Sequence, residues 1–140
     1  MFRKDKADKN PRNNALSKLE VYKELEKLTS HMNYSIDAII VEGPHDVKTM
    51  RLLGYDGVIL SFSRKGSLVE FSDYIAKKFR KVAILTDFDK EGESLSNNFS
   101  RLLTDKRVKT ETFFRRKFRG LLKKVNLSTI ESIYSLKRRM

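Results

Sequence analysis

The sequence predicts an α/β fold, with a mostly parallel four-stranded sheet and helices on both faces. Two observations support this prediction. The apolar runs Ala38-Ile39-Ile40-Val41 and Val82-Ala83-Ile84-Leu85 are continuous rather than alternating, as expected of strands that are buried on both faces of a parallel sheet. Segments with helical periodicity separate the predicted strands, and this alternation implies right-handed crossovers between parallel strands.

Local patterns predict each element in turn. Apolar residues recur at helical spacing over residues 14–32 and predict an amphipathic packing helix. A strand at 36–42 ends in Glu42-Gly43-Pro44, after which Asp46 can cap a helix at 46–53. The remaining elements are expected, in chain order, as a strand at 55–60, a helix at 68–79, a strand at 82–86, a helix at 91–103 and an edge strand at 108–113.

Composition divides the chain into three parts. Residues 1–13 are polar and predict a flexible basic arm, while residues 14–113 hold the N-terminal helix and the α/β core. Residues 114–140 predict a basic, helical C-terminal extension. Within it, Ser128-Thr129-Ile130-Glu131 has the pattern of a capping box and predicts the start of the last helix.

Charge and cysteine content narrow the functional classes. The 140 residues suffice for one domain, and 30 Lys and Arg against 18 Asp and Glu give a net charge of +12. Such an excess is typical of proteins that bind nucleic acid, although a lysine-rich surface can also serve solubility alone. The absence of Cys excludes disulfides, thiolate zinc sites and a cysteine nucleophile. With neither a membrane-spanning run nor an apolar N-terminal signal, we expect a cytoplasmic protein without a membrane partner.

A dense acidic segment follows the strand at 82–86. Asp87, Asp89, Glu91 and Glu93 fall within seven positions, and their charges repel one another unless a cation or a proton compensates. Carboxylate oxygens of this kind suit Mg²⁺. The alternative is an acidic first helical turn that complements the helix dipole. Because the loops at 42–43, 63–67 and 87–93 all leave the carboxyl ends of the strands, where α/β sheets hold their sites, the metal interpretation is favoured.

Basic residues form two further candidate sites. Basic residues and phenylalanines are interleaved from Phe113 on, a pattern that suits binding to RNA or to single strands. An amphipathic helix with solvated basic side chains would show the same pattern. We expect the phenylalanines to pack and the charge to bind. In the loop before residue 68, phosphate could be held by charge and by backbone N–H groups, with a plain helix cap as the alternative. The candidate nucleic-acid-binding residues are Arg64, Lys65, Ser67, Lys90, Arg115, Arg116, Lys117 and Arg119.

Two acidic motifs together resemble the Toprim domain. Glu42-Gly43-x-x-Asp46 follows one strand, and Asp87-x-Asp89-x-Glu91-Gly92-Glu93 follows a later one. The resemblance covers about residues 36–113. The domain is shared by type IA and type II topoisomerases, bacterial-type primases, old-family nucleases and recombination-repair proteins. The chain is most similar to the small stand-alone Toprim proteins of archaea and to the catalytic half of the bacterial 5S ribosomal RNA maturation ribonuclease.

The resemblance implies a role for each acidic residue. Glu42 matches the general acid/base and metal ligand of the family, and Asp87 and Asp89 match its catalytic metal-binding aspartates. Glu91 is implied as a further metal ligand and Asp46 as an auxiliary acid. The implied cofactor is Mg²⁺, with Mn²⁺ as a substitute. His45 lies beside the predicted site and could contact phosphate, although a solvated loop histidine is the favoured interpretation.

The expected activity follows by elimination within the family. The chain has no room for a strand-passage domain and lacks the Cys of a primase zinc module. We therefore expect a Mg²⁺-dependent phosphodiester hydrolase, an endonuclease on structured ribosomal or other stable RNA, with RNA favoured over DNA. Two alternatives stay open: a non-catalytic nucleic-acid-binding module in a replication, repair or RNA-processing complex, and a DNA-directed nuclease. A homodimer or a protein partner is also left open.

Overall fold

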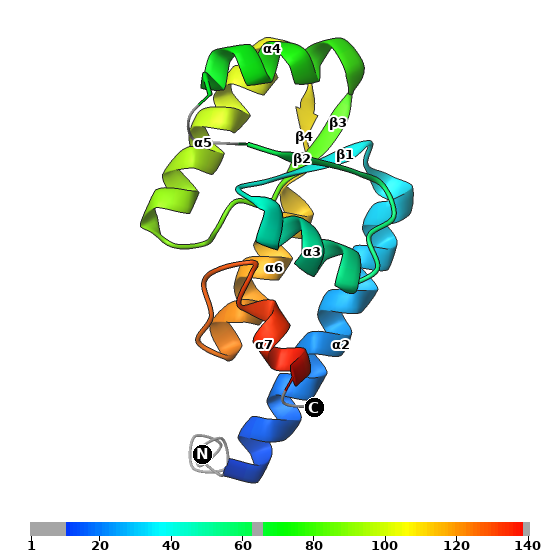
Figure 1. The fold of residues 1–140 in the computed structure, drawn as a ribbon, viewed down its shortest axis with the longest axis vertical. Coiled ribbons are helices and arrows are strands. Elements are labelled where there is room, and N and C mark those ends of the chain that lie inside the picture. Colours follow the sequence, from blue (N-terminus) through cyan, green and yellow to red (C-terminus); the bar gives the residue numbers. More distant parts are fainter. Residues whose placement is uncertain (1–10, 63–65, 139–140) are drawn as a thin grey trace, which may run out of the picture.

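A four-stranded sheet forms the centre of the structure, a computed structural model that describes residues 11–62 and 66–138 (Figure 1). The strands are β1 (Ala38–Val41), β2 (Val58–Ser61), β3 (Lys81–Ile84) and β4 (Lys109–Thr110). They lie in the order β2-β1-β3-β4, and every neighbouring pair is parallel. The predicted α/β class, the parallel sheet and the helices on both faces are confirmed.

The two apolar runs form the central strands. Ile40 of β1 is paired with Leu60 of β2 on one side and with Ile84 of β3 on the other. All four residues of β1 are buried, whereas β2, at the edge of the sheet, is partly exposed. Because β1 and β3 are neighbours in register, the segments that follow them leave the sheet side by side.

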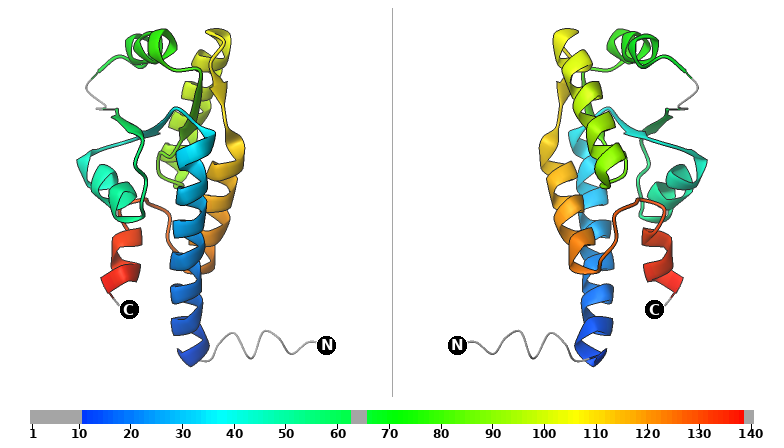
Figure 2. Two further views of the ribbon diagram at one scale, coloured as in Figure 1. Left: turned by 90° about the vertical axis from the view of Figure 1, so that its right-hand side faces the viewer. Right: turned by 90° about the vertical axis from the view of Figure 1, so that its left-hand side faces the viewer.

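Each face of the sheet carries its own apolar core. On one face, alternate side chains such as Ile39 and Val41 pack with α2 (Pro11–Ser35), α3 (Pro44–Leu52), α6 (Thr112–Lys124) and α7 (Ile133–Arg138). On the other face, Ile40 and Ile84 pack with α4 (Leu68–Lys78) and α5 (Lys90–Asp105). Figure 2 shows α2 and α6 running side by side along the first of these faces.

The connections reverse direction at the middle of the sheet. From β1 the chain passes through α3 to β2 on one side, and from β3 it passes through α5 to β4 on the other. The gap between β1 and β3 is therefore a topological switch point, and ligands of open α/β sheets bind outside the carboxyl ends of the strands at such points.

Several boundaries differ from the sequence prediction, three of them in ways that bear on the site and the termini. The edge strand expected at 108–113 is shorter, because Glu111 accepts a hydrogen bond from the Phe113 N–H and α6 begins at Thr112. The last helix begins at Ile133, with Thr129 rather than Ser128 accepting a hydrogen bond from the Ser132 N–H. Helix α2 begins at Pro11, while residues 1–10 of the predicted arm lie outside the described residues.

The C-terminal part packs into the main core. Phe118, Leu122 and Ile130 are fully buried, and they share a core with α2 and β1. The expectation that the phenylalanines pack therefore applies to Phe114 and Phe118, whereas Phe113 is exposed. Residues 114–138 consequently support the sheet rather than extend from it.

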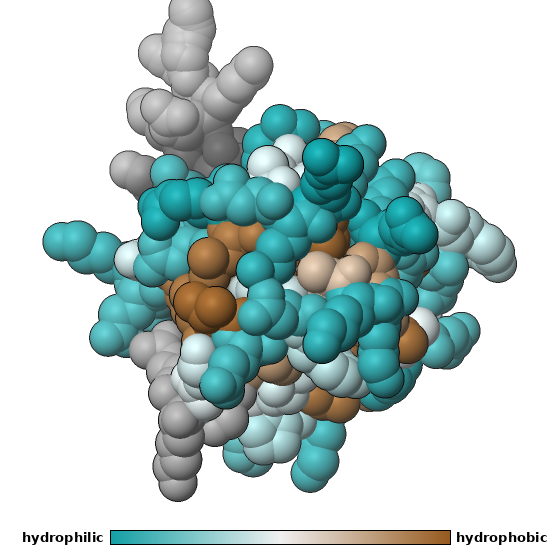
Figure 3. Space-filling model, turned by 90° about the horizontal axis from the view of Figure 1, so that it is seen from above, coloured by the Kyte–Doolittle hydropathy of each residue, from teal (hydrophilic) through white to brown (hydrophobic). Residues whose placement is uncertain are grey.

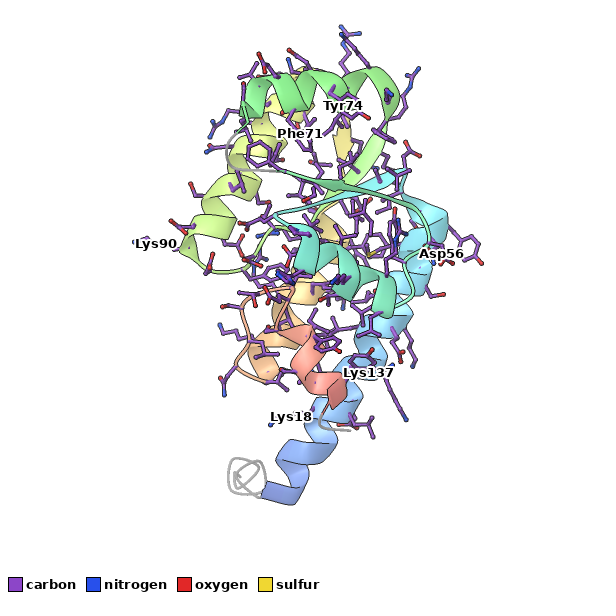
Figure 4. The ribbon with its side chains drawn as sticks, in the orientation of Figure 1. Lys18, Asp56, Phe71, Tyr74, Lys90 and Lys137 are labelled. Carbon is purple, nitrogen blue, oxygen red and sulfur yellow. The ribbon has the colours of Figure 1, made fainter. Side chains whose placement is uncertain are left out.

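The surface of the described residues is mainly polar. Figure 3 shows a small apolar area among hydrophilic side chains, seen from above the view of Figure 1. Helix α4 exposes Val69 and Tyr74, and Figure 4 shows Tyr74 and Phe71 on this helix. Scattered exposed apolar side chains of this kind are ordinary on a protein surface. Among the helices of residues 11–62 and 66–138, none has the length and apolar character needed to cross a membrane.

Candidate metal and nucleic-acid site

The two acidic motifs meet at the switch point of the sheet. Glu42 follows β1 directly, and Asp87 lies three residues beyond the end of β3. The backbone N–H of Asp87 donates a hydrogen bond to Oε2 of Glu42 over 2.8 Å. Glu42 and Asp87, which are 45 positions apart in the sequence, are thus joined at the switch point, where sheets of this kind bind ligands.

The acidic loop closes on itself through Gly92. Oγ1 of Thr86 donates to the carbonyl oxygen of Gly92 over 2.8 Å, and Oδ1 of Asp89 accepts from the Gly92 N–H over 2.8 Å, which caps α5. A Cβ at position 92 would lie 2.5 Å from the carbonyl carbon of Asp87. This close approach explains why the loop requires glycine there.

The segment after α6 covers the acidic loop from a distant part of the chain. The Phe88 N–H donates to the carbonyl oxygen of Ser128 over 2.6 Å, and the Ile130 N–H donates to Oδ1 of Asp87 over 3.1 Å. Ile130 is itself fully buried, which fixes its backbone in place. This contact could not be predicted from the sequence, because a backbone amide in a loop leaves no residue pattern.

Arg115 supports the same loop from within the protein. Its guanidinium donates to the carbonyl oxygens of Ile84 (3.1 Å), Thr86 (2.8 Å) and Asp87 (2.9 Å). The Cζ atom lies 4.6 Å from the centroid of the Phe88 ring, and the residue is 6% exposed. Burial lowers the pKa of the Arg115 guanidinium, while the nearby Glu93 opposes that shift. The expected contact of Arg115 with nucleic acid is therefore corrected to a structural role.

Glu93 completes this support. Its Oε1 lies 3.1 Å from Nη2 of Arg115, and its Oε2 accepts from Nε of Arg119 over 2.7 Å. A second hydrogen bond joins Nη2 of Arg119 to Oε1 of Glu93 over 2.9 Å. Hydrogen bonding to Arg119 is the main cause that lowers the pKa of the Glu93 carboxyl. Arg119 is thus engaged in an ion pair, although its side chain stays 42% exposed.

Negative charge is crowded around Asp87. Burial is the main cause that raises the pKa of Asp87 to about 6, and the charges of Glu42, Asp46 and Asp89 raise it further, against the hydrogen bond from Ile130. Burial likewise raises the pKa of Asp46, whose Oδ2 accepts from the Glu42 N–H over 3.3 Å. Asp46 lies in the first turn of α3, which begins at Pro44 rather than at Asp46 itself.

The carboxylate oxygens of this site are of the kind that Mg²⁺ prefers as ligands. Among the described residues, no three His, Cys, Asp or Glu side chains are grouped so that they could hold a metal ion on their own. Mg²⁺ commonly needs one or two protein carboxylates, with water and phosphate as the other ligands. Glu42 and Asp87 supply such oxygens, and the raised pKa of Asp87 reflects burial first and then neighbouring negative charge, which a cation would compensate.

The remaining acidic and basic candidates lie around this centre. Glu91 is in the first turn of α5 with an exposed side chain. Lys90 begins α5, and Figure 4 shows it pointing away from the sheet. His45 lies in the first turn of α3, and it is exposed.

The predicted phosphate-binding residues fall into two groups. Arg116 and Lys117 are exposed on α6, with Nζ of Lys117 5.6 Å from the centroid of the Phe113 ring. Ser67 accepts a hydrogen bond from the Glu70 N–H over 3.2 Å and caps α4. This is the plain helix cap that was the alternative to phosphate binding for that loop. Arg64 and Lys65 lie outside the described residues.

Comparison with known proteins identifies the family. The profile of the Toprim domain matches residues 37–118, a span that includes both acidic motifs. The chain belongs to the Toprim domain family. The resemblance found in the sequence is thereby confirmed, and Toprim membership indicates a metal-dependent function connected with nucleic acids.

Relatives of this Toprim protein are small archaeal proteins. A UPF0292 protein of Thermoplasma volcanium is 39% identical over 95 residues, which cover 68% of this chain and 77% of that protein. A UPF0292 protein of Pyrococcus abyssi is 36% identical over 117 residues, covering 84% and 86%. The solved structure of a putative protein from Aquifex aeolicus has a TM-score of 0.60 and 28% identity, covering 81% of this chain and 95% of that one. These names carry no activity, so the likeness to the 5S RNA maturation ribonuclease stays a prediction.

Proposed function

We propose that this Toprim protein is a Mg²⁺-dependent phosphodiester hydrolase that acts as an endonuclease on structured RNA. One observation carries the proposal: Glu42 and Asp87 are hydrogen-bonded to each other at the switch point, where burial, together with neighbouring carboxylates, raises the pKa of Asp87 to about 6. Strongly perturbed carboxylates at a ligand-binding edge are characteristic of functional sites.

The acidic residues at the switch point would have two roles, metal binding and proton transfer. Glu42 and Asp87 would hold Mg²⁺, for which Mn²⁺ can substitute, and the family resemblance implies Asp89 and Glu91 as further ligands. The bound ion would neutralise charge on the scissile phosphate and lower the pKa of the attacking water. Glu42 moves a proton to or from the water or the leaving oxygen, and the N–H of Asp87 holds its carboxylate in one orientation for that transfer.

The charge of the protein supports a polyanionic substrate. The net charge is +12, and the exposed Arg116 and Lys117 on α6, Lys90 on α5 and His45 on α3 are available to phosphates. Phosphate contacts of this kind set affinity and position without reading the sequence. The preference for RNA rests on the resemblance to the RNA maturation enzyme rather than on any contact that reads the sugar.

A second candidate function is a non-catalytic nucleic-acid-binding module. The observation that favours it is the hydrogen bonding of the carboxylates, since Asp89 caps α5 and Asp46 accepts a backbone N–H. Both side chains thereby stabilise the loop whether or not a metal ion binds. The two functions differ in one respect that can be measured, namely whether a phosphodiester bond is broken.

The test is cleavage of labelled structured RNA, single-stranded DNA and double-stranded DNA in Mg²⁺ or Mn²⁺. Glu42→Gln and Asp87→Asn should abolish cleavage, whereas Asp105→Asn, at an exposed carboxylate at the end of α5, should cleave like the wild type. The nucleic acid that is cut identifies the substrate class. Binding without cleavage, unaltered by substitution of Glu42 or Asp87, would support the binding module instead.

A further inference from the structure

A cleft of about 510 Å³ lies between α3 and the segment that leads into α7. Figures 1 and 2 show α7 lying beside α3, on the side of the molecule away from α4. The volume falls within the range of about 300–1,000 Å³ that is usual for ligand sites. Its lining comes from both elements: His45, Lys48, Thr49, Thr129, Glu131, Ser132, Tyr134 and Ser135.

The cleft adjoins the acidic cluster, which consists of Glu42, Asp46, Asp87 and Asp89. Thr129 and Glu131 flank Ile130, whose N–H donates to Oδ1 of Asp87 over 3.1 Å. On the opposite wall, His45 directly precedes Asp46, whose Oδ2 accepts a hydrogen bond from the Glu42 N–H over 3.3 Å. A strand whose phosphate lies at the acidic cluster would therefore have its neighbouring nucleotide at the mouth of this cleft.

The side chains of the cleft match the parts of a nucleotide. Tyr134 is 51% exposed, so its ring face is available for stacking on a base. Lys48 and His45 are exposed on α3 and can meet a phosphate. The Ser135 hydroxyl donates to the carbonyl oxygen of Ser132, which leaves the lone pairs of its oxygen as acceptors for a base amine or a sugar hydroxyl, whereas Thr49 is buried.

We propose that this cleft binds one unpaired nucleotide of the substrate strand, adjacent to the phosphate held by the acidic cluster. The base stacks on Tyr134, and Lys48 contacts the phosphate of that nucleotide. The proposal rests on the proposed function, because it takes the acidic cluster as the position of the scissile phosphate. It adds to that function a requirement for a locally unpaired strand.

The test uses single-stranded RNA and DNA oligonucleotides that carry 2-aminopurine, a fluorescent base whose emission falls when it stacks. The full chain is titrated into each oligonucleotide without divalent ions. Emission should fall with the wild type and with Tyr134→Phe, while Tyr134→Ala should lose the quenching and about tenfold or more in affinity. The matched control is Tyr74→Ala on α4, where the side chain is 45% exposed and lies outside the cleft.

A second variant tests the phosphate contact. Lys48→Gln should weaken binding and reduce the salt slope of log affinity by about 0.7, the value for one phosphate of a single strand. Lys77→Gln, an exposed lysine at the end of α4, should leave the slope unchanged. Circular dichroism spectra and melting temperatures of all variants establish that each remains folded.

The outcomes separate the cleft from the catalytic proposal. Equal affinity and equal quenching for Tyr134→Ala and Tyr74→Ala would overturn the cleft proposal, and cleavage by the wild type would then still support the hydrolase. Binding that depends on Tyr134 without cleavage in Mg²⁺ would support the cleft and overturn hydrolysis. No binding of either oligonucleotide by the wild type would overturn the cleft proposal, and the cleavage assay in Mg²⁺ would then test hydrolysis on its own.

Discussion

Replacement of Arg115 tests whether the C-terminal helix α6 holds the acidic loop. Arg115→Met keeps most of the volume of the aliphatic side chain but removes the guanidinium. The carbonyl oxygens of Ile84, Thr86 and Asp87 then lose donors at 3.1, 2.8 and 2.9 Å, and Glu93 loses one of its two arginine partners. We expect the loss to appear as reduced stability of the folded state.

The magnitude follows from burial and charge. Removing one partner of a buried charged network costs about 3–5 kcal/mol of unfolding free energy. Because Glu93 keeps its bidentate contact with Arg119, the lower end applies, and we expect a loss of about 3 kcal/mol. That is a large part of the roughly 5–15 kcal/mol that stabilises a typical domain.

The assay is urea denaturation followed by far-ultraviolet circular dichroism at constant pH. Arg116→Met is the matched control, because Arg116 is the exposed neighbour on the same helix, and its substitution should change the unfolding free energy by less than about 0.5 kcal/mol. A loss below about 1 kcal/mol for Arg115→Met, with weaker nucleic-acid binding, would refute the structural role and restore the binding role.

Three further predictions concern the loop, its charge and the basic surface. Gly92→Ala should lose metal-dependent activity and about 1–3 kcal/mol of stability, because the new Cβ would lie 2.5 Å from the carbonyl carbon of Asp87. Because the folded-state pKa of Asp87 is raised from 3.8 to about 6, its ionisation destabilises the metal-free protein as pH rises through that window. The melting temperature in EDTA should therefore fall more for the wild type than for Asp87→Asn over that range, and Mg²⁺ at neutral pH should raise the melting temperature of the wild type alone. Joint replacement of Arg116 and Lys117 by Gln should weaken nucleic-acid binding and reduce its salt slope by about 1–2.

Each of these predictions has a control within the chain. Gly120→Ala, in α6 and with open space around the new methyl group, should leave activity intact and raise stability by up to about 1 kcal/mol. Equal effects at both glycines would contradict the role given to the loop. If the melting temperature in EDTA changed with pH in the same way for the wild type and Asp87→Asn, that would contradict the raised pKa of Asp87 and the crowding of negative charge around it. Lys77→Gln with Lys78→Gln, on α4, should not change the salt slope. An equal change there would show that binding depends on the net charge of the protein and not on the position of Arg116 and Lys117.

The fold and the centre of the site could be predicted because they depend on local patterns. The continuous apolar runs of β1 and β3 marked the central strands, and the rule that sites lie beyond the carboxyl ends of parallel strands brought Glu42 and Asp87 together. Neighbouring strands in register then placed the two residues within hydrogen-bonding distance of each other.

The supporting contacts could not be predicted in the same way. The N–H of Ile130 reaches Asp87 across 43 positions, and any residue type except proline carries that donor. Arg115 was grouped with its basic neighbours, although the sequence held a signal: it lies on the same helical face as Phe118 and Leu122, where a charged residue is buried with them. An arginine among apolar positions of a helix is a candidate for a buried structural role rather than for phosphate binding.

Metal binding itself tests whether Glu42 and Asp87 hold a divalent ion. Titration calorimetry with Mg²⁺, and electron paramagnetic resonance with Mn²⁺, should show a bound ion in the wild type. Glu42→Gln and Asp87→Asn should bind more weakly by about tenfold or more, while Asp105→Asn should bind like the wild type. Equal affinity in all four proteins, or no binding by the wild type, would contradict the account.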